Sequence, residues 1–163
     1  MTAKKFIRLG LVLILCVVGG TTAPAIALAA GAVAVWDLED LTPVPSAAAD
    51  MGEILSAAVI ETFKESGDYT VVERQRLLLV LEELNLGTTE LSSESTRLEI
   101  GRLIGARLMV FGSYIVINDT MRMDLRKVEV ETGLVLKAVS KTTLGTDIVE
   151  WLKITREAAK ELL

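Results

Sequence analysis

The sequence predicts a single mixed α/β (α+β) domain in which helices pack on a mixed β-sheet. Two observations predict this class. In the first part of the chain, short apolar runs typical of buried strands alternate with segments whose apolar residues recur at helical spacing. After Arg107 the period changes to two, which is typical of strands with one buried face. Helical crossovers make the early strands parallel and tight turns make the later ones antiparallel, so the expected order is β-α-β-α-α-β-β-β-α.

Residues 1–29 are predicted to be a cleavable signal peptide. Its positively charged start is made by Lys4, Lys5 and Arg8. Residues 9–18 follow as an apolar run that is too short for a membrane-spanning helix, which needs about 20 such residues. Small residues then fit the small-x-small cleavage rule, and cleavage is expected after Ala29. An uncleaved anchor is the alternative, and the short apolar run argues against it.

Cys16 raises the alternative of a lipid anchor, because an acylated cysteine lies at this depth in lipoprotein leaders. The residue before such a cysteine is small, whereas Leu15 stands here. Cleavage at this point would also leave an apolar tail over residues 17–30. The sequence therefore argues against lipidation and predicts an exported periplasmic domain over residues 30–163.

The charge and the missing side chains exclude several function classes. The leader holds three of the 17 basic residues and none of the 22 acidic ones, so residues 30–163 carry 14 − 22 = −8 charges. An acidic domain without a basic cluster argues against nucleic acid as a partner. The chain has no histidine, and its single cysteine lies in the leader. Thiol catalysis, His-assisted serine chemistry and zinc sites with N or S ligands are thereby excluded, and neither a metal nor a cofactor is expected.

The first half of the domain begins with an apolar strand over residues 32–36. A helix follows, with an apolar stripe made of Met51, Ile54, Leu55, Ala58, Val59 and Phe63. Asp50 and Glu53 are placed as its N-terminal cap pair, a start at Ser46 stays open, and Gly67 supplies the left-handed end. Residues 69–72 are expected to form the second strand.

Two more helices are expected before the period changes. The first is expected to be closed by Asn85 and Gly87. The second is expected to begin at a cap residue, Ser92 or Ser93, and to end at Gly105. Gly101 and Gly105 share the spacing of a helix-dimer motif. In a short soluble helix, however, Gly105 is interpreted as the C-terminal cap.

The last three strands are expected to form a meander. Residues 108–117 form a long strand, and Asn118-Asp119-Thr120 is a tight turn into the next strand. The apolar phase of that strand changes at Val128 and Val130, and a β-bulge near Arg126-Lys127 would explain the change.

A turn at Thr132-Gly133 leads into a last strand over residues 134–143. Lys137 and Lys141 share one parity on it, and lysines on an edge strand block unwanted pairing. We therefore expect a monomer or weak dimer in isolation. The closing helix over residues 147–163 is expected to place Ile148, Trp151, Leu152, Thr155 and Ala159 on one side.

Two groups of charged residues are candidates for a site. Asp37, Glu39 and Asp40 follow the first strand, where they could hold a divalent cation, although a solvated acidic loop is the more ordinary interpretation. Glu73 could be the nucleophile of a sugar-cleaving enzyme. With Arg74 it is interpreted more simply as part of a structural ion pair beside a helix cap, because no acid partner accompanies it.

Taken in order, these segments resemble the periplasmic domain of the curli-secretion family, the CsgG-like proteins. The resemblance spans about residues 33–143. It is carried by Val33 to Asp37, Tyr69 to Gln75, Leu81-Glu82-Glu83, Ile104 to Ser113, Leu125 to Val130, and Thr132-Gly133. It implies that the structural motif positions are Asp37, Glu73, Arg74, Gly105, Ala106, Gly112, Thr132 and Gly133.

The departures from the family bear on function. The curli pore resembles this domain with two membrane-spanning β-hairpins inserted, one at Asn118-Asp119-Thr120 and one before the last helix. Here a tight turn and Leu144-Gly145-Thr146 stand at these places, whereas each membrane strand needs about 9–11 residues. Pore formation is therefore not expected.

The resemblance implies a non-enzymatic binding or assembly factor of the cell envelope, accessory to the export or assembly of surface structures. Its expected partners are envelope proteins, and peripheral contact with the outer membrane stays open. The wider superfamily includes outer-membrane activators of peptidoglycan synthases, so a regulator of those enzymes is the alternative. A small nucleoside- or sugar-cleaving enzyme is a third hypothesis, which would depend on Glu73.

Overall fold

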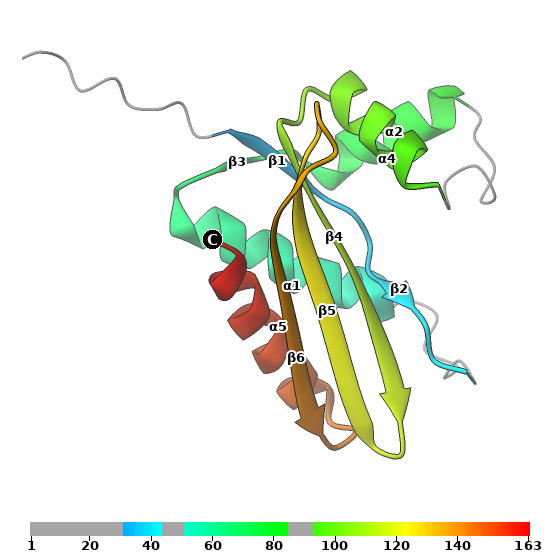
Figure 1. Cartoon of the computed structure of the whole chain (residues 1–163), viewed down its shortest axis with the longest axis vertical. Helices are drawn as coiled ribbons and strands as arrows, with labels where there is room; N and C mark the ends of the chain where they lie inside the picture. The colour runs from blue at the N-terminus through cyan, green and yellow to red at the C-terminus, as the bar shows by residue number, and fades with distance from the viewer. Residues whose placement is uncertain (1–30, 44–50, 85–92) are drawn as a thin grey trace, which may run out of the picture.

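The computed structural model describes residues 31–43, 51–84 and 93–163 (Figure 1). The predicted signal peptide lies outside these residues. So do the predicted helix ends at Ser46, Asp50, Asn85, Gly87 and Ser92. In the described part, strands and helices follow each other in the predicted α/β order, with one additional short strand.

Six strands form one mixed sheet. They are β1 (Ala32–Val35), β2 (Glu39–Asp40), β3 (Thr70–Val71), β4 (Leu108–Ile117), β5 (Thr120–Glu129) and β6 (Val135–Leu144). Their order across the sheet is β3-β1-β4-β5-β6, and β2 also pairs with β4. The strand β1 pairs in parallel with β3 and with β4, and β2 pairs in parallel with β4, whereas β5 pairs antiparallel with both β4 and β6. The predicted mixed sheet and its meander are therefore confirmed.

Four helices are described, and they cover the sheet unequally (Figure 1). They are α1 (Met51–Ser66), α2 (Arg74–Leu84), α4 (Glu94–Leu103) and α5 (Ile148–Leu162). The helices α1 and α5 pack on one face: α5 lies along β5 and β6, and α1 packs against α5 and the strands β1, β2 and β3. The helices α2 and α4 lie on the other face at the upper end only, so the lower part of the β4–β5–β6 meander extends beyond them.

Two hydrophobic clusters separate these layers. The larger one lies between the sheet and α1 and α5, where Leu55, Val59 and Phe63 are 0% exposed. The smaller one lies under α2 and α4, and Leu77 is the one buried residue that α2 contributes to it. The layer made of α1 and α5 therefore holds most of the core.

The β4–β5 hairpin has the tight turn that the sequence predicts. The φ angles of Asn118 and Asp119 are 47° and 58°, which is the left-handed pair of a two-residue type I′ turn. A register shift lies between Lys127 and Val128, at the predicted place. The extra residue is Leu136 of β6, however, because Lys127 pairs with Lys137 and Val128 with Val135. The predicted phase slip within β5 is therefore wrong.

The apolar phase of β5 changes for a different reason. Side chains alternate along the whole strand, with Met123 and Leu125 in the larger cluster and Val128 and Val130 in the smaller one. At its lower end the strand is covered on one face only, by α5. At its upper end the other face is covered as well, by α4. The change marks where the second layer of helices begins.

Two other expectations are corrected. The segment expected to be an acidic loop contains β2, which pairs with Ser113 and Tyr114 of β4. On α5, Ile148 is 38% exposed, and the buried face also includes Ile154, Ala158 and Leu162. Asp147 caps this helix by accepting a 2.9 Å hydrogen bond from the backbone N–H of Val149, so Ile148 lies in an exposed first turn.

Within the described ranges, no helix has the length and apolar character needed to cross a membrane.

Candidate binding surface

An ion-pair cluster around two of the motif residues, Asp37 and Arg74, joins the end of β1 to α1 and α2. Arg74 begins α2, and its Nη2 and Nε donate to Asp37 at 2.8 Å and 3.2 Å. Its Nη1 lies 2.8 Å from Glu53 of α1. Asp37 also accepts a 3.1 Å hydrogen bond from Ser56. The hydrogen bond to Asp37 raises the pKa of Arg74, and the cluster fixes the end of β1 against both helices.

Glu73 does not take part in this cluster. Its side chain is exposed, and its backbone carbonyl accepts a 3.0 Å hydrogen bond from Arg76. The ion pairs of the Glu73-Arg74 segment are made by Arg74 alone among the described residues, with two carboxylates that lie far away in the sequence.

The remaining motif residues occupy turns and close contacts. Gly105 (φ 75°) and Gly133 (φ 71°) adopt left-handed conformations that favour glycine. Ala106 is buried beneath α4, and Thr132 Oγ1 donates to Glu129 at 2.8 Å. A side chain at Gly112 would clash with Leu125 and press on Leu38. We therefore place these five residues in the framework.

The three carboxylates after β1 point to different partners. Asp37 pairs with Arg74, Glu39 lies 3.8 Å from Arg97, and Asp40 accepts a 2.8 Å hydrogen bond from the N–H of Thr42. Throughout the described residues, no group of three Asp, Glu, His or Cys side chains is arranged to hold a metal ion.

Asp40 and Tyr114 are coupled across β2 and β4. Burial would raise the pKa of Asp40, but hydrogen bonds from Thr42 and Tyr114 outweigh it, and the pKa lies below its usual value. Burial, together with the hydrogen bond to Asp40, raises the pKa of Tyr114 to about 12. As a residue, Tyr114 is 4% exposed and belongs to the core under α1 and α5.

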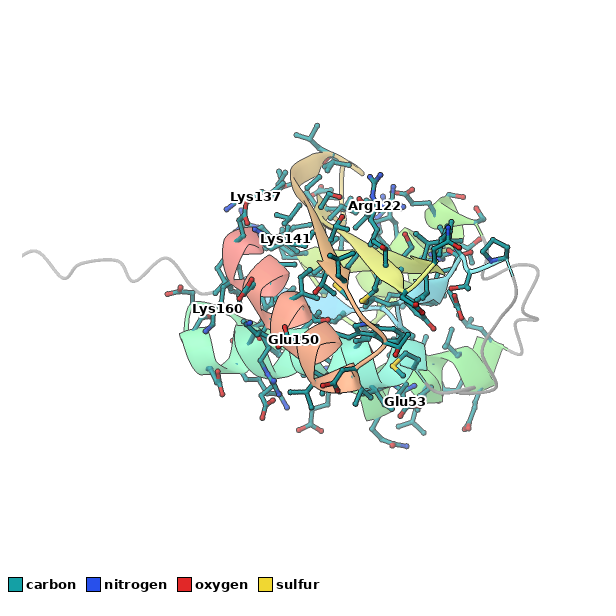
Figure 2. All side chains as sticks on the ribbon, turned by 90° about the horizontal axis from the view of Figure 1, so that it is seen from below. Glu53, Arg122, Lys137, Lys141, Glu150 and Lys160 are labelled. Atoms are coloured by element: carbon teal, nitrogen blue, oxygen red, sulfur yellow. The ribbon has the colours of Figure 1, made fainter. Side chains whose placement is uncertain are left out.

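The described helices leave the lower part of the second sheet face open (Figure 1). We call it the uncovered face. It is formed by Ser113, Ile115 and Ile117 of β4, Arg122, Asp124 and Arg126 of β5, and Ala138, Ser140, Thr142 and Leu144 of β6, with Glu39 and Leu41 beside them. Figure 2 shows Arg122 on this side of the sheet, whereas Glu53, Glu150 and Lys160 lie on the side of α1 and α5.

A stack of aromatic rings and guanidinium groups forms the upper border of the uncovered face. Arg97 of α4 lies 5.8 Å from the Trp36 ring and 5.9 Å from the Phe111 ring, and Arg126 lies 5.6 Å from the Phe111 ring. Arg126 is also held by Glu94, at 2.9 Å. The stack attaches α4 to the sheet at this border.

Below this border lies a groove of about 380 Å³. Its floor is made of the small side chains of Ser113, Ala138 and Ser140, and Glu39 and Asp124 carry its carboxylates. A floor of small residues lets another chain approach the sheet closely, while hydroxyl and carboxylate oxygens provide hydrogen-bond acceptors.

The charges of the uncovered face are balanced. The ion pairs on it are Arg97–Glu39, Arg126–Glu94 and Arg122–Asp124. Burial would raise the pKa of Asp124, but hydrogen bonds from Arg122 and Ser140 lower it. The face therefore carries no excess charge, in contrast to residues 30–163 as a whole, which carry 14 − 22 = −8 charges.

Sequence reasoning missed this surface, although one signal for it was available. The alternation of Arg122, Asp124 and Arg126 indicated a polar face on β5. It did not indicate that Glu39 would lie beside Ser113, or that Arg97 of α4 would close the upper border. Those contacts depend on pairings between residues far apart in the chain.

The chain matches one protein family and several solved structures. The family described as the curli production assembly/transport component CsgG matches residues 27–118, which is more than half of the chain. No curated protein matches the chain.

Solved structures share the fold at low sequence identity. The LpoB C-terminal domain from Salmonella enterica is 20% identical, with a TM-score of 0.58 over 71% of this chain and 84% of that one. Lipoprotein GNA1162 from Neisseria meningitidis is 12% identical, with a TM-score of 0.56 over 82% and 99%. A PelC dodecamer from Paraburkholderia phytofirmans is 18% identical, with a TM-score of 0.52 over 84% and 88%.

Proposed function

This chain belongs to the CsgG family, and on that premise we propose that it is a non-enzymatic binding and assembly factor of the cell envelope. It is exported to the periplasm and is accessory to the export or assembly of surface structures. Its partners are envelope proteins, which it recognises through the uncovered face.

The observation that carries this proposal is the incomplete cover of the sheet. A sheet face without helices is normally solvated and polar or buried by a partner. Here the exposed side chains include Leu41 (51%), Ile117 (48%) and Leu144 (79%) beside fully paired arginines. This mixture of apolar and paired polar side chains supports the proposal, because reversible interfaces as a whole are about as apolar as the rest of a protein surface.

Site-specific photocrosslinking in the native envelope tests this proposal. A photoreactive residue at Thr142, on the uncovered face, should crosslink to one or a few envelope proteins. The same residue at Lys64, an exposed position on α1, is the matched control and should give no such product. Equal crosslinking from both positions would contradict the proposal.

Regulation of peptidoglycan synthases is the second candidate function. The fold shared with the LpoB C-terminal domain favours it, because the wider superfamily includes activators of these synthases. Recovery of a transpeptidase from the Thr142 crosslink, and loss of that product in Arg122→Glu, would select this candidate over a role in export or assembly.

The enzyme hypothesis has a direct test. If Glu73 were a nucleophile, Glu73→Gln would abolish a sugar- or nucleoside-cleaving activity without changing the melting temperature. We propose that no such activity exists, because Glu73 is exposed and the described residues around it provide no ion-pair partner.

Export and the absence of a pore are also part of the proposal. Intact mass should show a secreted protein that lacks about 29 residues, as the short apolar leader predicts. A diacylated Cys16 or a retained Met1 would contradict this. In planar bilayers, the protein should give no conductance steps, because the tight turn at Asn118-Asp119 has no room for a membrane hairpin.

A further inference from the structure

The outer edge of β6 ends the sheet, and its pairing groups are available. In the described residues, β6 pairs on one side only, with β5. The two-residue turn at Asn118-Asp119 makes Ile117 and Thr120 a hydrogen-bonded pair. Hydrogen-bonded and non-hydrogen-bonded pairs alternate from there, so even-numbered residues of β5 bond to β4 and odd-numbered ones bond to odd-numbered residues of β6. The even-numbered residues of β6 therefore direct their N–H and C=O groups outward.

The exposed side chains of β6 suit a second copy of the same strand. Ala138, Ser140 and Thr142 are small or polar and exposed, so another strand can approach closely. Leu136 and Leu144 are 47% and 79% exposed at the two ends. In an antiparallel self-pairing, the apolar end of one copy meets the apolar end of the other.

The two lysines of β6 select one register. The outward N–H and C=O groups are satisfied only when even-numbered residues of one copy face even-numbered residues of the other. Three such registers overlap the two strands almost completely, with the two-fold axis at Val139, Ser140 or Lys141. A two-fold axis at Val139 would place Lys137 opposite the partner's Lys141, and an axis at Lys141 would place this lysine opposite itself. Like charges directly opposite each other are destabilising. An axis at Ser140 places Lys137 opposite Thr143 and Lys141 opposite Val139.

We propose that this chain forms a two-fold dimer through antiparallel pairing of β6 with β6 of a second copy, centred on Ser140. The proposal is independent of the proposed function. Lys141 is already ion-paired with Glu161 of its own α5, so its charge is balanced when the copies approach. The dimer places both uncovered faces side by side in one continuous sheet, which doubles the surface available to a partner.

The dimer should be weak. Leu136 lies at the β-bulge, so regular pairing ends at the contact between Leu136 and the partner's Leu144. One short strand pair buries less than the roughly 1,000 Å² that stable interfaces exceed. Analytical ultracentrifugation should therefore show a reversible monomer–dimer equilibrium that depends on protein concentration. A monomer at every concentration, or a stable ring of many copies, would overturn the proposal.

Cysteine crosslinking tests the register. In the chain with Cys16→Ser, a thiol introduced at position 140 is the only one, and its Cα should lie about 5.5 Å from its counterpart, within disulfide range. Ser140→Cys should give a disulfide-linked dimer at least tenfold faster than Ala138→Cys or Thr142→Cys, whose thiols are separated along the strand. Equal rates for the three variants would overturn the register.

Side-chain substitutions at the end of the strand provide a second measurement. Leu144→Asp should raise the dissociation constant at least tenfold, because it removes the apolar contact with Leu136. Val149→Asp is the matched control, since Val149 is 64% exposed on α5 rather than on the edge of β6. Equal weakening by both variants would overturn the proposal.

Discussion

The two helical layers differ in how much of the sheet they cover and how tightly they pack. The helices α1 and α5 bury apolar residues along their whole lengths, and Leu55, Val59 and Phe63 are fully buried. The helix α2 buries Leu77 alone, although it carries five other large aliphatic residues. The first layer therefore provides the core, and the second covers the upper end of the sheet without closing the face.

This difference separates stability from recognition within one sheet. The side of β4 and β5 that faces α1 and α5 holds Tyr114, Met121 and Met123, all nearly or fully buried. The opposite side of the same strands holds Arg122 and Asp124, which pair with each other in solvent. A substitution on one side should therefore change folding, whereas a substitution at the adjacent residue, on the other side, should change binding.

The largest expected effect lies in the α1–α5 layer. Phe63→Ala should lower the free energy of unfolding by about 3–5 kcal/mol, because a fully buried ring leaves a cavity. Leu79→Ala on α2 should change it by less than about 0.5 kcal/mol, since Leu79 is 51% exposed. Urea unfolding at constant m-value measures both. Similar losses would mean that the two layers contribute equally to stability.

Much of this fold could be predicted, because local patterns determined it. The bounds of β4, the turn at Asn118-Asp119 and the left-handed Gly105 follow from alternation and turn chemistry over a few residues. The sequence could not show which helix covers which end of the sheet. Val128 and Val130 were therefore interpreted as a slip of phase, although they mark the start of the second layer.

The candidate site was harder to predict than the fold. The motif residue Arg74 was associated with Glu73, its neighbour in the sequence, whereas its partners Asp37 and Glu53 are 37 and 21 residues away. The uncovered face depends on β2 pairing with β4 and on α4 reaching Phe111. Neither contact has a local signal, so both required the three-dimensional structure.

The second prediction concerns pH and the buried side of β4. Because the pKa of Tyr114 is raised to about 12, the neutral phenol stabilises the fold fully below pH 10, the ordinary tyrosine value, and this stabilisation is lost as the pH rises toward 12. Two pKa units correspond to roughly 2–3 kcal/mol. In urea unfolding, Tyr114→Phe should lack this fall in the free energy of unfolding between pH 10 and 12. It should keep the part of the pH dependence that comes from other groups. Parallel pH profiles for both proteins would show that Tyr114 ionises freely.

The third prediction compares glycines in the two layers. A Cβ at Gly52 of α1 would clash with the backbone carbonyl of Leu38, whereas one at Gly101 of α4 would meet the flexible side chain of Met109. Gly52→Ala should therefore destabilise the fold by about 1–3 kcal/mol. Gly101→Ala should cost less than Gly52→Ala, because the gain in helix propensity of about 1 kcal/mol offsets part of the displacement of Met109. The reverse order in thermal unfolding would contradict tight packing of α1.

The smallest expected effect on stability is on the uncovered face. Arg122 pairs with Asp124 in solvent, and such exposed pairs contribute little to folding, so Arg122→Glu should leave the urea midpoint unchanged. Arg156 of α5 is its control, since it pairs with Glu61 at 3.6 Å on the opposite side of the sheet. Both variants reverse one exposed charge, but only Arg122→Glu disturbs the balanced ion pairs of the uncovered face. Crosslinking from Thr142 should therefore fall in Arg122→Glu and persist in Arg156→Glu. Equal loss in both would show that net charge, rather than this face, governs recognition.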